Sequence, residues 1–284
     1  MRTLSPRLTQ RIAFSILFAA TLFVILPVAF IIGVILKNGL GAVNWEFLTA
    51  MPRASMREGG ILPAIVGTFC LVAGAVLFAL PLGLCAAIYL SEYSKDSRLN
   101  RAVRLAIVNL AGVPSVVFGL FGLALFVGFF RFGASILAGS LTLGLMILPV
   151  IITSSREALD AVPGSFREVS LSLGATKLQT IKYAVLPHAL PGILTGTILG
   201  VGRAAGETAP ILFTVAAFYL PRLPRSIFDQ AMALPYHLYV LSTQVPNVAP
   251  KIRYGTALVL LAIVLLMNFL AIAIRSHFRA KKKW

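Results

Sequence analysis

ILPAIVGTFCLVAGAVLFALPLGLCAAIYL, residues 61–90, decides the fold class because it contains no charged side chain. An α-helix needs about 20 predominantly apolar residues to cross the hydrocarbon core of a bilayer. A helix that is apolar on every face belongs in a membrane or in the core of a large protein. We therefore predict that this segment crosses a membrane.

Five further segments are apolar over a similar length, which predicts six membrane-spanning helices and an all-α integral membrane protein. Barrel strands need only about 10 residues, so these segments are too long for a barrel. We expect the prolines inside the spans to kink the helices rather than break them. The six predicted spans are Ile12–Leu36, Ile61–Leu90, Leu105–Phe130, Phe132–Thr153, Pro191–Phe218 and Gly255–Ile274.

Composition supports the membrane assignment and argues against nucleic acid as a partner. Hydrophobic residues make up 58% of the chain and charged residues 12%, against about 25% charged in soluble domains. The net charge of +16 could suggest a DNA-binding protein. However, the basic residues are spread between apolar blocks that are too long for a soluble core.

Basic residues also predict the topology, with both termini in the cytoplasm. That orientation places 16 Lys and Arg residues inside and 8 outside, with Arg203 left within a span, as the positive-inside rule favours. We divide the chain into an N-terminal helix and external loop (1–60), a core of five spans (61–275) and a basic cytoplasmic tail (276–284).

Two loops are longer than a simple connection requires, and long ordered loops tend to carry function. The external loop, Tyr219–Tyr254, contains an apolar and aromatic stretch, Ser226–Thr243. We predict a short helix here that lies at the membrane interface and is broken near Pro235. The same stretch is a candidate docking surface for an extracytoplasmic protein.

The cytoplasmic loop, Ser154–Leu190, contains PGSFREVSLSLGATKLQTIKYAVLPHALPG, which starts at Pro163. Ser165 and Glu168 have the spacing of a capping box, and Thr176 and Gln179 repeat it. Gly174 between them is a good helix stop, because glycine tolerates the left-handed conformation. The pattern predicts a helix, a glycine elbow and a second helix, which two prolines, Pro187 and Pro191, would end.

The first helix of this loop presents Leu171 and Leu173 beside polar serines. Such an elbow could enter a groove on a soluble partner. Alternatively, it could lie as an amphipathic turn on lipid headgroups.

The fifth predicted span contains two charged residues, Arg203 and Glu207. Charges at the bilayer centre cost a few kcal/mol or more, so they face protein or water. The i, i+4 spacing allows the two to pair. Three glycines on the same arc, Gly192, Gly196 and Gly200, predict a close helix interface.

Two interpretations of this pair remain open. It could be a structural ion pair that fixes helix packing. Alternatively, Arg203 contributes to an anion pathway, because its planar guanidinium offers paired donors and stays charged, while Glu207 tunes or gates that pathway.

The cytoplasmic elbow resembles the EAA loop of bacterial ABC importer permeases. The match rests on Glu168, on Gly174 six residues later and on Leu186-Pro187, with Val169 and Ser170 in place of the two family alanines. In that family the loop forms a coupling helix that sits in a cleft of an ATPase subunit. The resemblance implies that Glu168, Leu171, Leu173, Gly174 and Ala175 shape the contact.

Three further blocks resemble PstA-type phosphate permeases: AGVPSVVFGLFG (Ala111–Gly122), PHALPGILTG (Pro187–Gly196) and RAAGETAP (Arg203–Pro210). The resemblance implies a type I ABC importer permease fold in the bacterial cytoplasmic (inner) membrane. It also implies a heterodimer with a related second permease, two ATPase subunits and an extracytoplasmic phosphate-binding protein. ATP and Mg would bind the ATPase partner, because this chain has no Walker phosphate loop.

Other functions have less support in the sequence. The substrate could be another oxyanion, such as sulfate, molybdate or phosphonate, or the chain could be a secondary transporter or channel, or a structural subunit. We expect no catalytic residue and no cofactor in this chain. We also expect no metal site, because the three histidines, His188, His237 and His277, are scattered along the chain.

Overall fold

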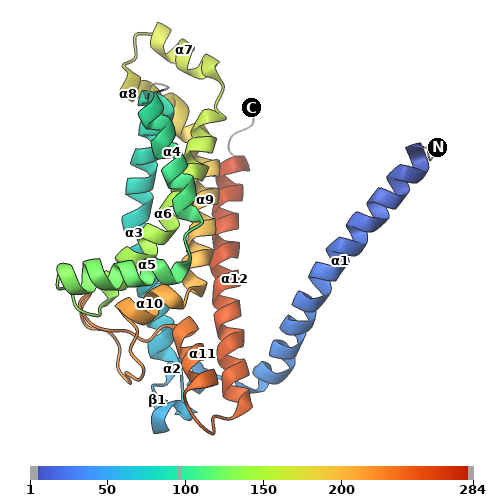
Figure 1. The fold of residues 1–284 in the computed structure, drawn as a ribbon, viewed down its shortest axis with the longest axis vertical. Coiled ribbons are helices and arrows are strands. Elements are labelled where there is room, and N and C mark those ends of the chain that lie inside the picture. Colours follow the sequence, from blue (N-terminus) through green and yellow to red (C-terminus); the bar gives the residue numbers. More distant parts are fainter. Residues whose placement is uncertain (1–5, 95–96, 281–284) are drawn as a thin grey trace.

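The computed structural model describes residues 6–94 and 97–280, which fold into a helical bundle with one small hairpin (Figure 1). The hairpin pairs two short antiparallel strands, β1 (Pro52–Arg53) and β2 (Glu58–Gly59). The α-helices are α1 (Pro6–Gly39), α2 (Trp45–Thr49), α3 (Leu62–Ile88), α4 (Arg98–Ala111), α5 (Ser115–Gly122), α6 (Ile136–Asp160), α7 (Gly164–Ser172), α8 (Lys177–Gln179), α9 (Leu186–Gly206), α10 (Ala209–Thr214), α11 (Leu234–Thr243) and α12 (Pro250–Ala280). Short 3₁₀ turns cover η1 (Leu40–Ala42) and η2 (Ala54–Met56), and wider π-helical turns cover η3 (Tyr89–Tyr93), η4 (Leu123–Phe129) and η5 (Thr180–Val185).

Five helical segments of the described chain are long and apolar enough to cross a membrane, and a bent pair makes a sixth if it counts as one span. The single segments contain α1, α3, α6, α9 and α12. The bent pair, α4 with α5 and η4, turns through 102°. The prediction of a continuous third span over Leu105–Phe130 is therefore wrong. The break falls at Gly112-Val113-Pro114, because a residue before proline is disfavoured in the helical conformation.

The centre of the bundle is formed by α3, α6 and α9, with α12 packed on α9. Fully buried apolar side chains such as Leu71, Met146, Ile147 and Ile211 fill it. The packing follows from the apolar length of these helices and from glycines that let them approach closely. This core fixes the position of α9, which carries the predicted charged pair.

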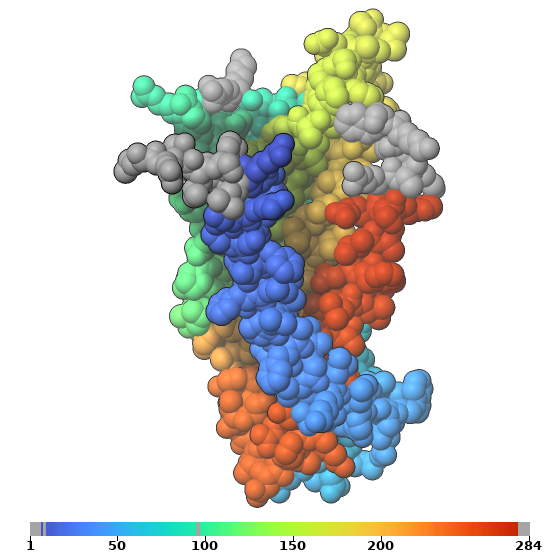
Figure 2. Space-filling model, turned by 90° about the vertical axis from the view of Figure 1, so that its right-hand side faces the viewer, coloured from blue at the N-terminus to red at the C-terminus, as the bar shows by residue number. Residues whose placement is uncertain are grey.

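Helix α1 stands apart from the bundle. It leans away at one end and joins α12 at the other (Figure 1), where a Cβ on Gly39 would lie 2.6 Å from the Tyr254 carbonyl oxygen. Figure 2, seen from the side of α1, shows the helix running over the front of the molecule rather than within it. Its phenylalanines, including Phe18 and Phe23, are exposed, so α1 has an apolar surface that the described chain does not cover.

The start of α1, the end of α12 and the α7–α8 region lie toward one end of the molecule, and α2, the hairpin and α11 lie toward the other (Figure 1). Because the start of α1 and the end of α12 lie toward the same end, the arrangement agrees with a chain that crosses the membrane an even number of times. Arg2, Lys95 and Lys281–Lys283, which are among the basic residues predicted to be cytoplasmic, lie outside the described residues.

Candidate functional site

Arg203 and Glu207 lie where a membrane helix stops. Arg203 is in the last turn of α9, and Glu207 follows that helix in an extended conformation. Arg203 Nε lies 3.4 Å from Glu207 Oε1, with 34% and 19% of the two side chains exposed. The pair is thus formed and partly accessible in the isolated chain.

The prediction that the fifth span continues to Phe218 is wrong, because α9 ends at Gly206 and the short α10 starts at Ala209. Pro210 explains the break. It has no N–H to donate to the carbonyl of Gly206, four residues earlier, and its ring would clash with that carbonyl. Irregular backbone at membrane depth is tolerated where protein or a water-filled cavity covers it. Glu207 lines a small cavity here, together with Thr68 and Val72 of α3.

Two of the blocks that resemble phosphate permeases meet at this break. A Cβ on Gly119 of α5 would lie 3.0 Å from both the Ala209 oxygen and the Pro210 Cα. Helix α5 therefore packs directly on the segment that follows Glu207. Its other face is exposed and apolar, including Val117, Leu120 and Phe121.

The three glycines of the predicted interface, Gly192, Gly196 and Gly200, face α6 but are not equivalent. A Cβ on Gly192 would overlap Ala158, and one on Gly196 would overlap Ser154. A Cβ on Gly200 would lie 3.5 Å from Ile147, which is ordinary contact. The helices are therefore closest in the half of α9 nearest the elbow.

The cytoplasmic loop forms the predicted elbow. Gly174 adopts a left-handed φ of +83° between α7 and α8. The Gln179 amide N–H donates to Thr176 Oγ1 at 3.3 Å, and the Thr176 N–H donates to Gln179 Oε1 at 2.8 Å, which confirms the second capping box.

Two details of the loop prediction are wrong. Ser165 is not a cap, because α7 already begins at Gly164 after Pro163. Pro187 and Pro191 do not end the second helix, because the chain runs through η5 into α9 without a break. The π-helical turns of η5 come directly before Pro187. The absence of an N–H in proline therefore removes no bond from a regular series of α-helical hydrogen bonds.

The elbow presents an apolar surface. We define the elbow surface as the exposed side chains of Val169, Leu171, Leu173 and Leu178, of which Leu173 is 83% exposed. Glu168 is also exposed, and Ala175 is partly buried. Exposed apolar patches of this kind mark interaction sites.

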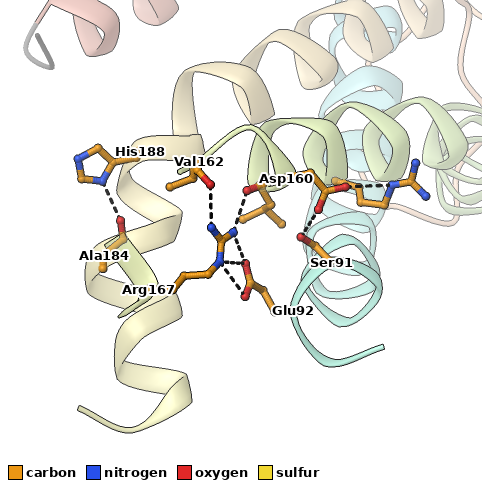
Figure 3. A network of polar contacts seen from close by, with 9 residues as sticks. Ser91, Glu92, Asp160, Val162, Arg167, Ala184 and His188 are labelled. Atoms are coloured by element: carbon orange, nitrogen blue, oxygen red, sulfur yellow. Dashed lines mark hydrogen bonds and ion pairs between the residues drawn. The ribbon is translucent and has the colours of Figure 1, made fainter. Parts of the chain in front are cut away.

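Sequence reasoning missed the side chain that fixes this elbow, Arg167 (Figure 3). Arg167 Nη2 lies 2.6 Å from Glu92 Oε1 in η3, and Arg167 Nε donates to both Glu92 oxygens at 3.1 and 3.3 Å. The same guanidinium donates to the carbonyls of Leu159 and Val162, at 2.9 and 2.8 Å. One signal for this pair was present in the sequence: Glu92 comes just after the apolar segment 61–90, and Arg167 lies in the cytoplasmic loop 75 residues later.

The external loop differs from its prediction. Helix α11 begins at Leu234 with Pro235 in its first turn, where proline is favoured, so no break occurs there. Tyr236 and His237 of this helix are buried, and α11 packs on α3 and α12, so part of its surface contacts protein; its position at the membrane interface stays a prediction. Burial lowers the pKa of His237 to about 4.

A polar cluster closes the same loop around Asp229. Its carboxylate accepts from the backbone N–H of Arg225 and from Arg222 Nη1. These contacts, the backbone bond first, lower the pKa of Asp229. Within residues 6–94 and 97–280, no three His, Cys, Asp or Glu side chains are grouped to hold a metal.

A bundle of membrane helices with an exposed elbow between spans is the arrangement expected of an ABC importer permease, and comparison with known families shows that class. The chain belongs to the family described as binding-protein-dependent transport system inner membrane component, whose model matches residues 79–284. It is a permease component of an inner membrane and not an enzyme.

Curated relatives cover most of the chain. "Phosphate transport system permease protein PstA 1" of Mycobacterium tuberculosis is 34% identical over 279 residues, which cover 96% of this chain and 90% of the relative. "Probable phosphate transport system permease protein PstA" of Methanocaldococcus jannaschii is 35% identical, with 93% and 90% covered. "Probable ABC transporter permease protein YqgI" of Bacillus subtilis is 34% identical, with 84% and 85% covered.

Solved structures support the fold. A chain of a bacterial ABC transporter involved in the import of the acidic polysaccharide alginate matches with a TM-score of 0.65 at 15% identity, covering 95% of this chain and 99% of that chain. A chain of the MetNI methionine ABC transporter matches with a TM-score of 0.59 at 16% identity, covering 77% and 97%. The chain therefore has the type I ABC importer permease fold.

Proposed function

We propose that this chain is the permease subunit of an ATP-driven importer that moves inorganic phosphate across the bacterial cytoplasmic membrane. The observation that carries the proposal is the similarity to PstA phosphate permeases along nearly the whole chain. The packing of Gly119 against Pro210 supports it, because two of the resembling blocks form one structural unit beside Arg203 and Glu207.

In this proposal Arg203 contacts the substrate in the pathway. Guanidinium groups bind phosphate oxygens through paired N–H donors and remain charged at all relevant pH values. Glu207 competes for the same donors, so it prevents phosphate from binding Arg203 too tightly to be released. The weak 3.4 Å geometry of the pair suits a contact that exchanges partners.

The proposed pathway needs a second permease subunit. The exposed apolar faces of α1 and α5 have no cover in the described chain, and exposed apolar patches mark contact sites. A related permease that packs on these faces would enclose Arg203 and form the heterodimer.

The elbow surface is the proposed dock for the ATPase. Its leucines would enter a cleft on one of two ATPase subunits, which bind ATP and Mg. Gly174 provides the turn, Ala175 leaves room beside it, and Glu168 lies at the rim as a polar contact. The elbow end of the molecule then faces the cytoplasm, with both termini. The opposite end, with exposed Arg53 and Arg57, faces the extracytoplasmic phosphate-binding protein, and lipid surrounds the spans between.

A competition assay tests the substrate. The chain would be reconstituted in proteoliposomes with its second permease, ATPase and binding protein, and uptake of labelled phosphate would be measured. We expect uptake to require ATP and to resist excess sulfate, molybdate or phosphonate. Preferential uptake of one of these anions would contradict the substrate, and uptake without ATP would contradict the importer mechanism.

A matched pair of variants tests the dock. Leu173→Asp places a charge on the elbow surface, so we expect the ATPase to be lost on purification in detergent. Ile227→Asp changes an exposed residue of the external loop and should retain it. Equal ATPase recovery in both variants would contradict the assignment of the elbow.

A further inference from the structure

The π-helical turn η3, which continues α3, contacts three separate parts of the cytoplasmic loop through three consecutive residues. Ser91 Oγ donates to Asp160 Oδ1 at the end of α6, at 2.5 Å. Glu92 binds Arg167 of α7 (Figure 3). Lys177 Nζ of α8 lies 4.6 Å from the centre of the Tyr93 ring. One π-helical turn, η3, therefore holds both arms of the elbow and the helix that leads into it.

The central contact is geometrically strong. Arg167 meets Glu92 with two nitrogens, and the Glu92 side chain is 8% exposed. Paired, charge-assisted hydrogen bonds of this kind fix direction as well as distance. The two carbonyls that Arg167 also binds belong to Leu159, in the last turn of α6, and to Val162, just after that helix.

Apart from the contacts of Arg167, α7 packs mainly on η5, where Ser170 Oγ and Thr180 Oγ1 lie 2.9 Å apart. None of the nine residues of α7 in the described structure is buried. Phe166 adds one apolar anchor, with its ring 4.6 Å from that of His188. If α7 is displaced, the Arg167–Glu92 contact is therefore the direct connection through which α3 would follow it.

The other half of α3 reaches the charged pair. Thr68 and Val72 line the small cavity with Glu207, and Thr68 Oγ1 accepts from the Leu234 backbone N–H at 2.9 Å. Three helices thus connect the elbow with the helix break. Helix α6 leads directly into the elbow and contributes Leu143 to the cavity, and α9 leads out of the elbow through the continuous chain. Helix α3 is joined to the elbow through Arg167 and Glu92.

We propose that the Arg167–Glu92 contact couples α3 to the movement of the elbow, so that α3 and α9 move together when the ATPase closes. Arg167 and Glu92 are positioning residues that touch neither phosphate nor nucleotide. The inference rests on the proposed function, because it assumes that an ATPase docks on the elbow surface.

A coupling measurement tests the residue pair. The number of phosphate ions transported per ATP hydrolysed would be compared in proteoliposomes for the wild type, Arg167→Gln and Arg167→Lys. Arg98→Gln is the control, because it also removes a positive charge from the proposed cytoplasmic side, in this case from an exposed residue. We expect Arg167→Gln to lower the ratio severalfold, because cycles of ATP hydrolysis would then move the elbow without moving α3. Lysine should recover part of the loss, and Arg98→Gln should match the wild type. A wild-type ratio in Arg167→Gln would overturn the proposal.

A distance measurement tests the movement itself and does not depend on phosphate transport. Spin labels at Tyr89 and Ser172, with Cys70 and Cys85 replaced, would be followed by electron resonance in the ATPase complex with and without nucleotide. In the wild type we expect the distance between the two labels to be the same with and without nucleotide. In Arg167→Gln we expect this distance to change when nucleotide binds. In the wild type, a nucleotide-dependent change of about 5 Å in the distance between the two labels, close to one helical turn, would overturn the proposal. A distance between the labels that stays unchanged in Arg167→Gln would also overturn it. If phosphate transport fails in the wild type while these distances behave as expected, the proposed substrate is wrong and the coupling contact stands.

Discussion

Substituting single glycines of α9 tests how closely this helix packs on α6. Gly196→Ala places a Cβ that overlaps the Ser154 Cβ and lies 2.9 Å from Ser154 Oγ. The helices must separate or Ser154 must shift, and such overpacking costs about 1–3 kcal/mol. At Gly200 the nearest atom would be 3.5 Å away, so no separation is needed.

The difference between the two variants is the informative quantity. Both gain the higher helix propensity of alanine, worth up to about 1 kcal/mol, so this gain cancels. Gly196→Ala should therefore be less stable than Gly200→Ala by about 1–3 kcal/mol. Reversible unfolding in mixed detergent micelles would measure the free energies of unfolding.

A double variant identifies the clash. In Gly196→Ala with Ser154→Gly the opposing Cβ is absent, so most of the lost stability should return, because contacting residues are not additive. Equal stability of the Gly196→Ala and Gly200→Ala variants would refute the reasoning. A double variant no better than Gly196→Ala alone would also refute it.

Three further predictions concern the elbow and the external loop. Gly174→Ala puts a side chain on a φ of +83°, which costs about 1–2 kcal/mol, and ATPase recovery on purification should fall without loss of the folded permease. Thr176→Ala removes a cap worth about 1 kcal/mol, so hydrogen exchange in α8 should quicken while exchange in α6 stays unchanged. Burial lowers the pKa of His237 to about 4, against about 6.5 in the unfolded chain, so unfolded chains bind the extra proton between these values. The free energy of unfolding should therefore hold above pH 6.5 and fall toward pH 4 by at most about 1.4 kcal/mol per unit; His237→Leu should weaken this dependence, and an unchanged pH profile would contradict it.

Much of the fold could be predicted from the sequence because long apolar segments dictate membrane helices. The length of residues 61–90 identified α3, and Gly174 with Thr176 and Gln179 identified the elbow. These features depend on residues close together in the chain, where spacing alone determines the geometry.

Hydropathy could not predict where spans break or bend. It measures apolar length and not direction, so Leu105–Phe130 and Pro191–Phe218 both looked continuous. The position of Pro210 four residues after Gly206 did carry the signal for the second break. The 102° bend after α4 depends on packing against α10, which the sequence does not display.

The candidate site was predictable only in part. Arg203 and Glu207 were identified because charges are rare within spans. Arg167 and Glu92 were missed because their pairing depends on the folded positions of α3 and α7. The two arms of the elbow could be predicted locally, but the contact that fixes their direction could not.

The central claim is that Arg203 lies in a phosphate pathway driven by a separate ATPase. The most direct test is phosphate-stimulated ATP hydrolysis and uptake in proteoliposomes, with all partner subunits and either wild-type, Arg203→Gln or Arg98→Gln permease. The account predicts that wild type and Arg98→Gln couple phosphate to hydrolysis, whereas Arg203→Gln assembles but moves little phosphate. Normal phosphate uptake by an assembled Arg203→Gln permease would contradict it.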